Sequence, residues 1–407
     1  MNTAEAFRAD RMGVAHLTKM AFDGVDLRPL WHEMMAKVTD NPEGAGFGMD
    51  LSVIAQLLGD QKTGLAIQKE VLGYQQLYRS PYIASTPSLR VLAFAAEMDI
   101  GGNTPIEFLL EGTSIELTTL YVIPGTPLPA HLPAHDVAIV VAPGDDKVQA
   151  TLDEIERVTA DWPCRILNAA MRIRALDRDR LYRLLRSIKG LEIPKTARLF
   201  RADLAALSEA ELPRWLDDGT FPLIVRPTGS HAGRGLAKLE AASDIAGYLA
   251  QHQEAEFFIS HFVDYASPDG LFRKYRLVCV DGVPYACHMA ISDEWKIWYL
   301  NADMTLSEAK RAEEAHFMAT FDSEFAVRHA NPLSEAIKRI GLDYFQIDCA
   351  ETRDGDLLVF EADNTAIVHN MDSPTLFPYK APQMHKVFDA FVSMLYDHAG
   401  RPQACAA

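Results

Sequence analysis

The stretch Tyr344–Asp363, YFQIDCAETRDGDLLVFEAD, contains the pattern from which the fold and the chemistry of this chain can be worked out. It holds two runs of strand length, Tyr344–Cys349 and Leu357–Ala362, and both are rich in apolar and aromatic residues. Between them lies Asp354-Gly355, a residue pair that is typical of a tight hairpin turn. We therefore predict an antiparallel hairpin that turns at this pair.

Three carboxylates gather at the open end of this predicted hairpin. The turn places Asp348 opposite Glu361, and Asp363 follows on the same face two residues later. Like charges that face each other across strands destabilise a sheet unless a cation neutralises them. Oxygen ligands without histidine or thiolate suit Mg²⁺, which usually bridges carboxylates to substrate phosphates. We predict a magnesium site here, because the apolar neighbours argue against the alternative of a solvated acidic hairpin.

A glycine-rich loop gives the second chemical signal. The run FPLIVR, Phe221–Arg226, predicts a strand, and PTGSHAGRG follows it. The chain carries neither the P-loop pattern nor the glycine pattern of dinucleotide-binding domains. Glycines let backbone N–H groups approach a phosphate, and Arg226 at the end of the strand supplies positive charge. We predict that Arg226 binds phosphate together with the loop residues Gly229, Ser230, His231, Gly233 and Gly235.

The order of the remaining patterns predicts three regions. Residues 1 to about 80 show apolar residues at three- and four-residue spacing, which predicts helices, and SPYIASTPS after them is typical of a linker. Apolar runs at 89–96, 115–123 and 136–142 alternate with helical segments, which predicts a parallel α/β layer. Beyond residue 177 the pattern is one of hairpins and helices, including a hairpin that turns at Asp281-Gly282.

The composition excludes several classes of function. The chain has 407 residues, 48% hydrophobic, and 39 basic against 56 acidic residues give a formal net charge of −17. A chain this acidic is not expected to coat nucleic acid or an anionic membrane. No segment approaches the 18 or so apolar residues of a membrane span, and the opening residues lack a signal-peptide pattern. We expect a cytoplasmic protein, and we expect its five scattered cysteines to be free thiols.

With these features in place, the chain resembles the ATP-grasp superfamily, in its glutathione-synthetase and glutamate-ligase-like branch, from about Leu89 to near His398. PLIVRPTGSHAGRG is similar to the family's strand and glycine loop, with Arg226 at the usual lysine position. ALDRDRLYRLL is similar to the segment with the family's other nucleotide-binding lysine, and it places Arg180 there. The resemblance implies that both arginines clamp the phosphates of ATP.

The same resemblance assigns three further functions. FFISHFV is similar to the hinge that contacts adenine through its backbone, which implicates Ser260, His261 and Val263. Arg276 in KYRLVCVDG matches an arginine that is implied to stabilise the γ-phosphate and a later oxyanion. The family's metal-binding D…E-x-N pattern is similar to that of the hairpin carboxylates.

Three departures from the family pattern are visible. Both nucleotide lysines are arginines, which keep the charge and add bidentate contact but fit differently. The metal-site asparagine is replaced by Asp363, which adds a negative charge. The hinge position that often holds glutamine or glutamate is Ser260.

The resemblance implies an ATP-grasp fold of mixed α/β and α+β class, preceded by a Rossmann-like pre-ATP-grasp domain and a helical N-terminal segment. The expected boundaries are 1–85 for the helical segment, 86–190 for the pre-ATP-grasp domain and 191–400 for the ATP-grasp domain. The implied reaction is ADP-forming: ATP and Mg²⁺ activate a small-molecule carboxylate as an acyl phosphate, which an amine attacks. A homodimer is a further expectation.

Two alternatives stay open at this point. The chain could be an ATP-grasp enzyme that modifies a peptide or protein terminus, with residues 1–80 as a docking module. It could also be a nucleotide-binding interaction protein without catalysis. Substrate contacts are expected from polar residues near the predicted strand ends, namely Asn103, His288, Lys296, Asn301, His369 and Asn370. We interpret the aromatic run WKIW, Trp295–Trp298, as core rather than as part of a pocket.

Overall fold

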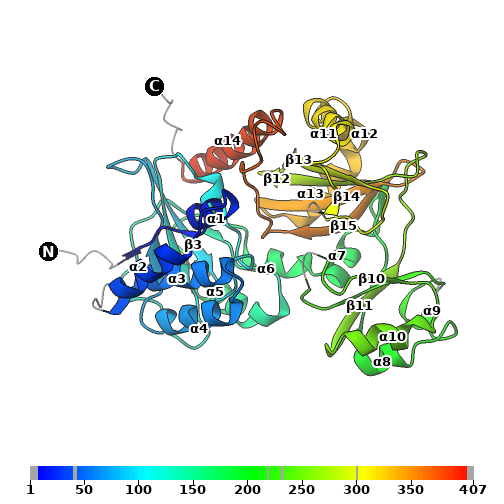
Figure 1. The fold of residues 1–407 in the computed structure, drawn as a ribbon, viewed down its shortest axis with the longest axis horizontal. Helices are drawn as coiled ribbons and strands as arrows, with labels where there is room; N and C mark the ends of the chain where they lie inside the picture. The colour runs from blue at the N-terminus through cyan, green and yellow to red at the C-terminus, as the bar shows by residue number, and fades with distance from the viewer. Residues whose placement is uncertain (1–7, 40–43, 218–219, 231–232, 299–300, 401–407) are drawn as a thin grey trace.

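The computed structural model describes residues 8–39, 44–217, 220–230, 233–298 and 301–400, whose strands form three sheets (Figure 1). The fold is mixed α/β with helices at the N-terminus, as the sequence predicts. An α/β unit occupies the left of Figure 1, and two further sheets lie one above the other on its right. The candidate site lies between these two sheets.

The α/β unit is built on a six-stranded sheet of order β1-β2-β4-β3-β5-β6. Only the β2–β4 pair is antiparallel among its neighbours. Three of its strands are buried almost throughout, as a sheet covered on both faces requires. This confirms the predicted parallel layer. Its strands are β1 (Ala9–Asp10), β2 (Leu77–Arg79), β3 (Leu89–Ala95), β4 (Ile115–Tyr121), β5 (Val137–Val140) and β6 (Ile166–Leu167).

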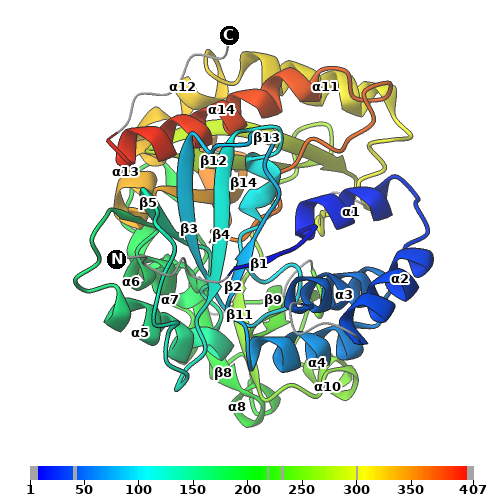
Figure 2. The ribbon, with the colours of Figure 1, turned by 90° about the vertical axis from the view of Figure 1, so that its left-hand side faces the viewer.

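The N-terminal segment is helical, but it is not a separate unit. Strands β1 and β2 fall within residues 1 to 80, which we predicted to be helical throughout, and they extend the sheet at β4. Such short strands carry no recognisable periodicity, and only their non-local partners define them. Figure 2 shows helices α1 to α4 toward the β1 edge and α5 to α7 toward the opposite edge. The N-terminal helices are α1 (Val14–Phe22), α2 (Arg28–Thr39), α3 (Ala45–Leu57) and α4 (Gln61–Leu72).

Helix α5 connects β5 to β6, and the elements after β6 lead to the second region. Of the helical segments expected between the strands, the one after β3 is only a 3₁₀ turn at Ile106–Leu109, whereas α5 after β5 is an α-helix. The segments found here are α5 (Gln149–Val158), α6 (Ala170–Ile173), α7 (Arg178–Leu185) and β7 (Leu191–Glu192).

The smaller right-hand sheet has four antiparallel strands in the order β10-β9-β11-β8. Its central strand β9 corresponds to the strand predicted for FPLIVR, and the other central strand, β11, contains the first residues of FFISHFV. A compact cluster of leucines and aromatic residues packs its helices against it. Its elements are β8 (Thr196–Phe200), α8 (Arg201–Ala205), α9 (Leu212–Trp215), β9 (Leu223–Pro227), β10 (Ala237–Leu239), α10 (Asp244–Gln251) and β11 (Glu256–His261).

The larger right-hand sheet has the order β13-β12-β14-β15-β7 and contains both predicted hairpins. Its first hairpin turns at Asp281 and Gly282, which both have positive φ, as a type I′ turn requires. The strands are β12 (Phe272–Val280), β13 (Val283–Ser292), β14 (Tyr344–Glu351) and β15 (Leu357–Asp363), and the helices are α11 (Glu308–Thr320), α12 (Phe325–Arg328), α13 (Ala330–Ile340) and α14 (Lys380–His398).

The second hairpin has the predicted pairing of Asp348 with Glu361, but its turn and its strand register differ from the prediction. The turn is one residue longer than predicted, because Thr352 and Asp356 close it and Gly355 takes a positive φ of 86°. A bulge at Phe360 then absorbs one residue and restores the predicted register at the carboxylates.

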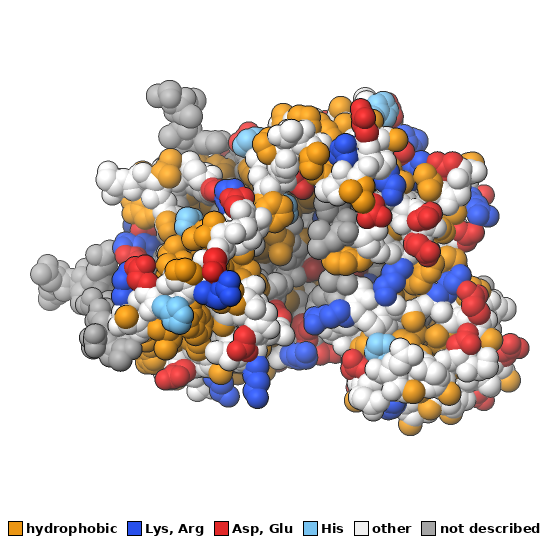
Figure 3. All heavy atoms as spheres, viewed as in Figure 1, with side chains coloured by type: hydrophobic (Ala, Val, Ile, Leu, Met, Phe, Trp, Pro, Cys, Tyr) orange, Lys and Arg blue, Asp and Glu red, His pale blue; other side chains and the backbone are white. Residues whose placement is uncertain are grey.

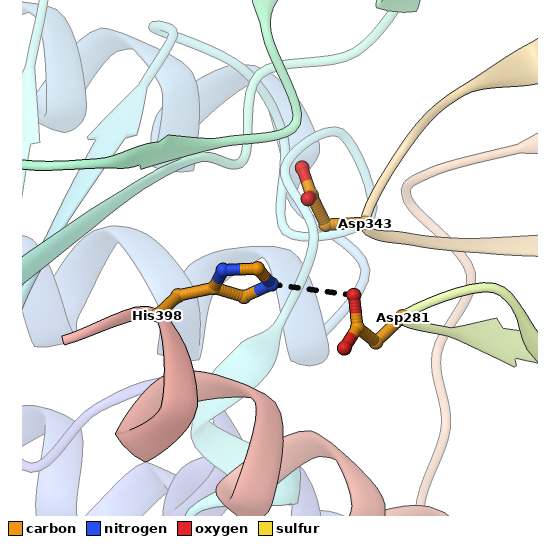
Figure 4. A group of neighbouring side chains, drawn as sticks. All are labelled: Asp281, Asp343 and His398. Carbon is orange, nitrogen blue, oxygen red and sulfur yellow. Dashed lines mark hydrogen bonds and ion pairs between the residues drawn. The ribbon is translucent and has the colours of Figure 1, made fainter. Parts of the chain in front are cut away.

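Helix α14 joins the large sheet to the α/β unit. Its Phe391 lies edge-on to Tyr344 of β14 with ring centroids 5.0 Å apart, and both are buried. At its end His398 Nε2 lies 3.2 Å from Asp281 Oδ1, beside Asp343 (Figure 4). Among the described helices, none is both long and apolar enough to cross a membrane. Cys279, Cys287 and Cys349 are buried free thiols, as predicted, and Cys164 is free and half-buried.

The contact between α14 and the sheet gives a prediction about stability. Phe391→Ala should lower the free energy of unfolding by about 3–5 kcal/mol, because a large buried ring is replaced by a cavity. Urea unfolding followed by far-ultraviolet circular dichroism measures this. Asp389→Ala on the exposed face of the same helix is the control and should change it by less than about 0.5 kcal/mol. Equal effects would show that α14 contributes little through this ring.

Candidate functional site

A cavity of about 580 Å³ lies between the two right-hand sheets. Strands β8, β9 and β11 of the small sheet form one wall, and strands β12 to β15 of the large sheet form the other. Figure 3 shows basic side chains along the seam between the upper and lower lobes on this face. Because the two walls come from different sheets, the cavity depends on how the sheets are held together.

A row of polar residues crosses four strands of the large sheet on the cavity wall. Residues Glu361, Asp348, Arg276 and His288 are successive cross-strand partners from β15 to β13. All four border the cavity. The hairpin register therefore brings the predicted catalytic arginine and two of the predicted metal ligands into one line.

Asp348 is fully buried and lies between two cations. Arg276 donates Nε–H and Nη2–H to its two oxygens at 2.8 and 3.1 Å, and Lys274 Nζ lies 2.6 Å from Oδ2. Burial acts to raise the pKa of Asp348, but Arg276 and Lys274 outweigh burial and hold this pKa far below its usual range. The carboxylate is therefore ionised across the physiological pH range, and it fixes both cations on the cavity wall.

Glu361 has its own cation. Arg178, in the first turn of α7, contacts the Glu361 carboxylate and also donates to the Phe360 carbonyl at 3.2 Å. Burial acts to raise the pKa of Glu361, but the attraction of Arg178 and other neighbouring cations lowers it to about 2. Both facing carboxylates are thus ionised, because each has a positive partner.

The third predicted ligand, Asp363, accepts hydrogen bonds from the Thr365 backbone N–H and hydroxyl, each at 2.8 Å. Asp348, Glu361 and Asp363 supply the hard oxygen donors that Mg²⁺ prefers, and they border the same cavity, so their chemistry fits this ion. The ligand oxygens of these three carboxylates do not all lie within 4.8 Å of one another, so the predicted cluster is looser than expected. Among the described residues, the acidic and histidine side chains that do converge within 4.8 Å are Asp281, Asp343 and His398.

That second group (Figure 4) lies far from the cavity wall in the fold, at the β12–β13 turn and the end of α14. Both oxygens of Asp343 have partners, because Arg165 contacts Oδ1 at 3.2 Å and the Asn168 N–H donates to Oδ2 at 2.7 Å. We interpret this group as a structural contact that links α14, the large sheet and the α/β unit.

Arg226, on β9, is buried and borders the cavity. Its guanidinium donates to the Ser230 hydroxyl at 3.1 Å and to the Ser230 carbonyl, and it forms no ion pair with a described residue. Burial, reinforced by repulsion from Arg178, lowers the pKa of Arg226 to about 9. A buried cation that is costly to charge and faces a cavity is suited to an anionic ligand.

The other part of the cavity is apolar and aromatic. Our interpretation of Trp295–Trp298 as core was wrong for the tryptophans, because both border the cavity and Trp298 is 41% exposed. Lys296, between them, donates to the Leu236 carbonyl at 2.8 Å, and burial and Arg226 lower its pKa. The apolar lining residues include Ile193, Ile224, Leu236, Phe258, Phe262, Val263, Ile297 and Leu358.

The cavity brings together most of the predicted site residues. Burial and Arg276 hold the pKa of His288 well below 6.5, so that its ring is neutral at pH 7. The predicted residues on the cavity are Arg226, Gly233, Ser260, His261, Val263, Arg276, His288, Lys296, Asp348, Glu361 and Asp363.

Other predicted residues lie elsewhere. Arg180 points away from the cavity and donates to the Arg174 carbonyl at 3.0 Å. Asn103 holds the backbone of Ala96 through both of its amide atoms. Gly229 and Ser230 border a smaller adjoining cavity, and Gly235 lies beside Pro227. Asn301 contacts Trp298 within a loop, and His369 lies against Phe22 and Phe108. Asn370 is exposed, and His231 lies outside the described residues.

Two important residues were missed. Arg178 takes the place on the cavity that we predicted for Arg180, because Asp177 caps α7 and the first helical residue faces β15. Lys274 lies two residues before Arg276, so that strand alternation puts both on one face. That alternation was readable in FRKYR and could have found Lys274.

Three solved structures illustrate what this fold is similar to. VanG D-Ala:D-Ser ligase from Enterococcus faecalis aligns with a TM-score of 0.46 and 11% identity, over 76% of this chain and 100% of its own. A RimK domain ATP-grasp protein from Sphaerobacter thermophilus aligns with a TM-score of 0.44 and 17% identity, over 76% of this chain and 99% of its own. D-alanine–D-alanine ligase from Bacillus anthracis, complexed with ATP, aligns with a TM-score of 0.44 and 14% identity, over 78% of this chain and 100% of its own.

Because the sequence identities are this low, these similarities describe the fold alone. The sequence matches no protein-family profile and no curated protein. The assignment to a glutathione-synthetase or glutamate-ligase-like branch therefore stays a prediction.

The charged row predicts the effect of removing its buried anion. Asp348→Asn should lower the free energy of unfolding at pH 7 by about 3–5 kcal/mol, because it leaves Lys274 and Arg276 without their counter-charge. The pKa of Asp348 is lowered in the folded state, so the ion pairs act fully above about pH 4 and weaken only as the pH falls below it.

Urea unfolding at pH 7 and at pH 5 measures this loss. Asp354→Asn, in the exposed turn of the same hairpin, is the matched control. The double variant Asp348→Asn with Lys274→Met should recover part of the loss, since one uncompensated cation is removed. A loss as small as that of the control would contradict the ion-pair argument.

Proposed function

We propose that this chain is an Mg-ATP-dependent ligase that activates a small-molecule carboxylate as an acyl phosphate for attack by an amine, with release of ADP. The observation that carries the proposal is that buried Arg226, which forms no ion pair with a described residue, borders one cavity together with a charged wall and an apolar, aromatic part. Such a cavity suits a ligand with a flat apolar part and a strongly anionic part. The ATP-grasp resemblance of the sequence points to the same ligand.

The charge balance of the cavity supports a polyanion. Among the described residues that border it, five are basic and three are acidic, which gives a net charge of about +2 with the histidines neutral. A nucleoside triphosphate with one bound Mg²⁺ carries a net charge of about −2 near neutral pH. The basic residues are Arg178, Arg226, Lys274, Arg276 and Lys296.

Asp348, Glu361 and Asp363 are the residues that would hold Mg²⁺, which would neutralise part of the charge of the phosphates. Arg178 and Arg226 would bind the α- and β-phosphates, with Arg178 in the role predicted for Arg180. Phosphoryl transfer is catalysed mainly by positioning and charge stabilisation, and it needs no covalent protein nucleophile.

Arg276 is proposed to stabilise the γ-phosphate and then the tetrahedral oxyanion. Its fixed ion pair with Asp348 holds the guanidinium in place before the substrate arrives, which is the preorganisation that such catalysis requires. The acyl phosphate and a protonated amine would give an amide, hydrogen phosphate and one proton. The C–O bond to the phosphate breaks as the C–N bond forms.

The apolar half of the cavity is proposed to hold the adenine ring. Phe258 and Phe262 come from β11 and the hinge after it, where Ser260, His261 and Val263 also border the cavity. Backbone groups of this hinge would contact the edge of the base, while the aromatic and aliphatic side chains cover its faces.

The structure bears on one alternative. Residues 1–80, the docking module of that alternative, contribute strands β1 and β2 to the six-stranded sheet. The same hydrophobic core contains Ala9, Leu77 and Tyr78 together with β3 to β5. Deleting the segment would damage the sheet, so modification of a peptide is better tested with peptide substrates and the full chain.

The test of the proposed function is ADP release from Mg-ATP with the full chain, across a panel of carboxylate and amine pairs. We expect release that requires both partners and gives one amide for each ADP, as detected by mass spectrometry. Release only with peptides would favour the modifying enzyme. Nucleotide binding without turnover under any condition would contradict the proposal.

Arg226 offers a separate prediction about nucleotide binding. Arg226→Met should leave the melting temperature of the ligand-free chain unchanged or higher, because a buried cation that forms no ion pair with a described residue is removed. The increase that Mg-ATP causes should be lost; for a ligand at 100 times its Kd this increase corresponds to about 2.7 kcal/mol. Differential scanning fluorimetry measures both effects.

Arg214→Met, at an arginine whose side chain is 74% exposed on α9, is the matched control and should keep the full ligand-induced increase. If Arg226→Met destabilises the ligand-free chain strongly but still responds to Mg-ATP, Arg226 is a structural residue and the phosphate assignment fails.

A further inference from the structure

Lys274 is a cation on the cavity wall to which the proposed reaction gives no part. It lies on β12 two residues before Arg276, and its Nζ is 2.6 Å from Asp348 Oδ2. Its side chain borders the cavity and is 19% exposed, whereas that of Asp348 is 0% exposed. The ammonium group therefore has two kinds of surroundings within its reach, the buried carboxylate and the space that we assign to the phosphates.

The carboxylate of Asp348 is closed to other cations while Lys274 and Arg276 are in place. A carboxylate offers about four lone-pair sites. Arg276 takes two of them with Nε–H and Nη2–H, and the Lys274 ammonium takes a third. Solvent does not reach the Asp348 oxygens, since the side chain has no exposed surface. Mg²⁺ usually keeps several of its bound waters, so it reaches Asp348 only if one of the two cations leaves.

Lys274 is better suited to leave than Arg276. Arg276 lies directly opposite Asp348 in the strand register and holds it with a rigid, planar fork of two N–H groups. Lys274 reaches the same carboxylate diagonally, from two residues earlier on β12, with a compact charge on a flexible four-carbon stem. Rotation of that stem carries the ammonium into the cavity without any change in the strands.

A Lys274 that has left Asp348 needs another anion. Besides Lys274, four basic and three acidic residues border the cavity among those that the structure describes. A partly buried ammonium without a counter-charge in these surroundings is costly. A phosphate group in the same cavity supplies that counter-charge, so the exchange is favourable only when a polyphosphate is bound.

We propose that Lys274 and Mg²⁺ are alternative cations for Asp348, and that Lys274 leaves the carboxylate for a phosphate oxygen of the nucleotide. Lys274 is thus a positioning residue that keeps Asp348 closed to metal until a polyphosphate is present. This rests on the proposed function for the identity of the polyphosphate. Because coupling between two binding sites is reciprocal, the metal and the nucleotide raise each other's affinity by the same factor.

The competition at Asp348 is tested with Mn²⁺, which takes the same oxygen ligands as Mg²⁺ and is followed by electron paramagnetic resonance. Binding is measured with the full chain in the absence of nucleotide. Lys274→Met removes the competing ammonium, so we expect it to bind Mn²⁺ about tenfold more tightly than the unchanged chain, as the loss of one charge-assisted contact predicts. Loss of a merely structural lysine would not raise the affinity for a metal ion.

Two further variants show where the additional Mn²⁺ affinity comes from. In the double variant Lys274→Met with Asp348→Asn the gain should disappear, because the carboxylate itself is then missing. Lys37→Met is the matched control: it breaks an exposed ion pair with Glu33 on α2 and changes the net charge equally. It should leave Mn²⁺ binding unchanged, since salt screens exposed charges. Lys274→Gln replaces Lys274→Met if circular dichroism shows that the latter fails to fold.

The contact with phosphate is tested with an ATP analogue whose terminal phosphate carries an acyl group. An amine that lies beside this phosphate attacks the carbonyl carbon, keeps the acyl group and releases the nucleotide. Mass spectrometry of the full chain should find Lys274 acylated about tenfold more with Mg²⁺ than with EDTA, relative to Lys296 on the same cavity, because Asp348 holds the ammonium when metal is missing.

Three results would overturn the proposal. The first is an unchanged Mn²⁺ affinity in both Lys274→Met and Lys274→Gln. The second is a gain that persists in the double variant, which would place the metal elsewhere. The third is labelling of Lys274, relative to Lys296, that is the same with Mg²⁺ and with EDTA.

Failure of this inference and failure of the proposed function give different results. If Lys274→Met gains Mn²⁺ affinity through Asp348 but no substrate pair yields an amide, the competition is supported and the ligase is rejected. If the substrate panel yields an active pair while Mn²⁺ binds equally to Lys274→Met and to the unchanged chain, the ligase is supported and the exchange of cations is rejected.

Discussion

The buried ion pairs of Asp348 are the constraint on which the rest of the site depends. Taking one carboxylate and two cations out of water is costly, and the cost is offset only if all three groups meet in good geometry. Asp348 lies on β14, whereas Lys274 and Arg276 lie on β12, so the pairs form only in one register. The same register aligns Glu361 and His288 with them. A single buried anion thereby sets the chemistry of a whole cavity wall.

The sequence was sufficient for this wall because strand pairing is a local rule. Hairpin signals and alternation predicted both hairpins, the pairing of Asp348 with Glu361, and the face that carries Asp363. The prediction of the turn was off by one residue, yet the bulge at Phe360 compensated for it. The parallel layer was equally readable, because strands buried on both faces are continuous apolar runs.

The other features of the fold and of the site depend on contacts between distant segments, which no local sequence pattern encodes. Whether Arg178 or Arg180 faces the cavity depends on where α7 begins and on how it packs against β15, not on the composition of ALDRDRLYRLL. Strands β1 and β2 are too short to show a period, and only their place beside β4 defines them. The tryptophans of WKIW are apolar like core residues, and only the packing of two sheets leaves them on a cavity instead.

The net negative charge of the chain is not distributed evenly around the two cavities. A formal charge of −17 would repel a nucleotide if it were spread evenly. Instead, Arg178, Arg226, Lys274, Arg276 and Lys296 line one cavity and five carboxylates line its neighbour. Arg178 and Glu361 form the boundary between the two, and their mutual contact prevents either charge from dominating both spaces. A wall of paired charges therefore allows two spaces of opposite net charge to lie side by side.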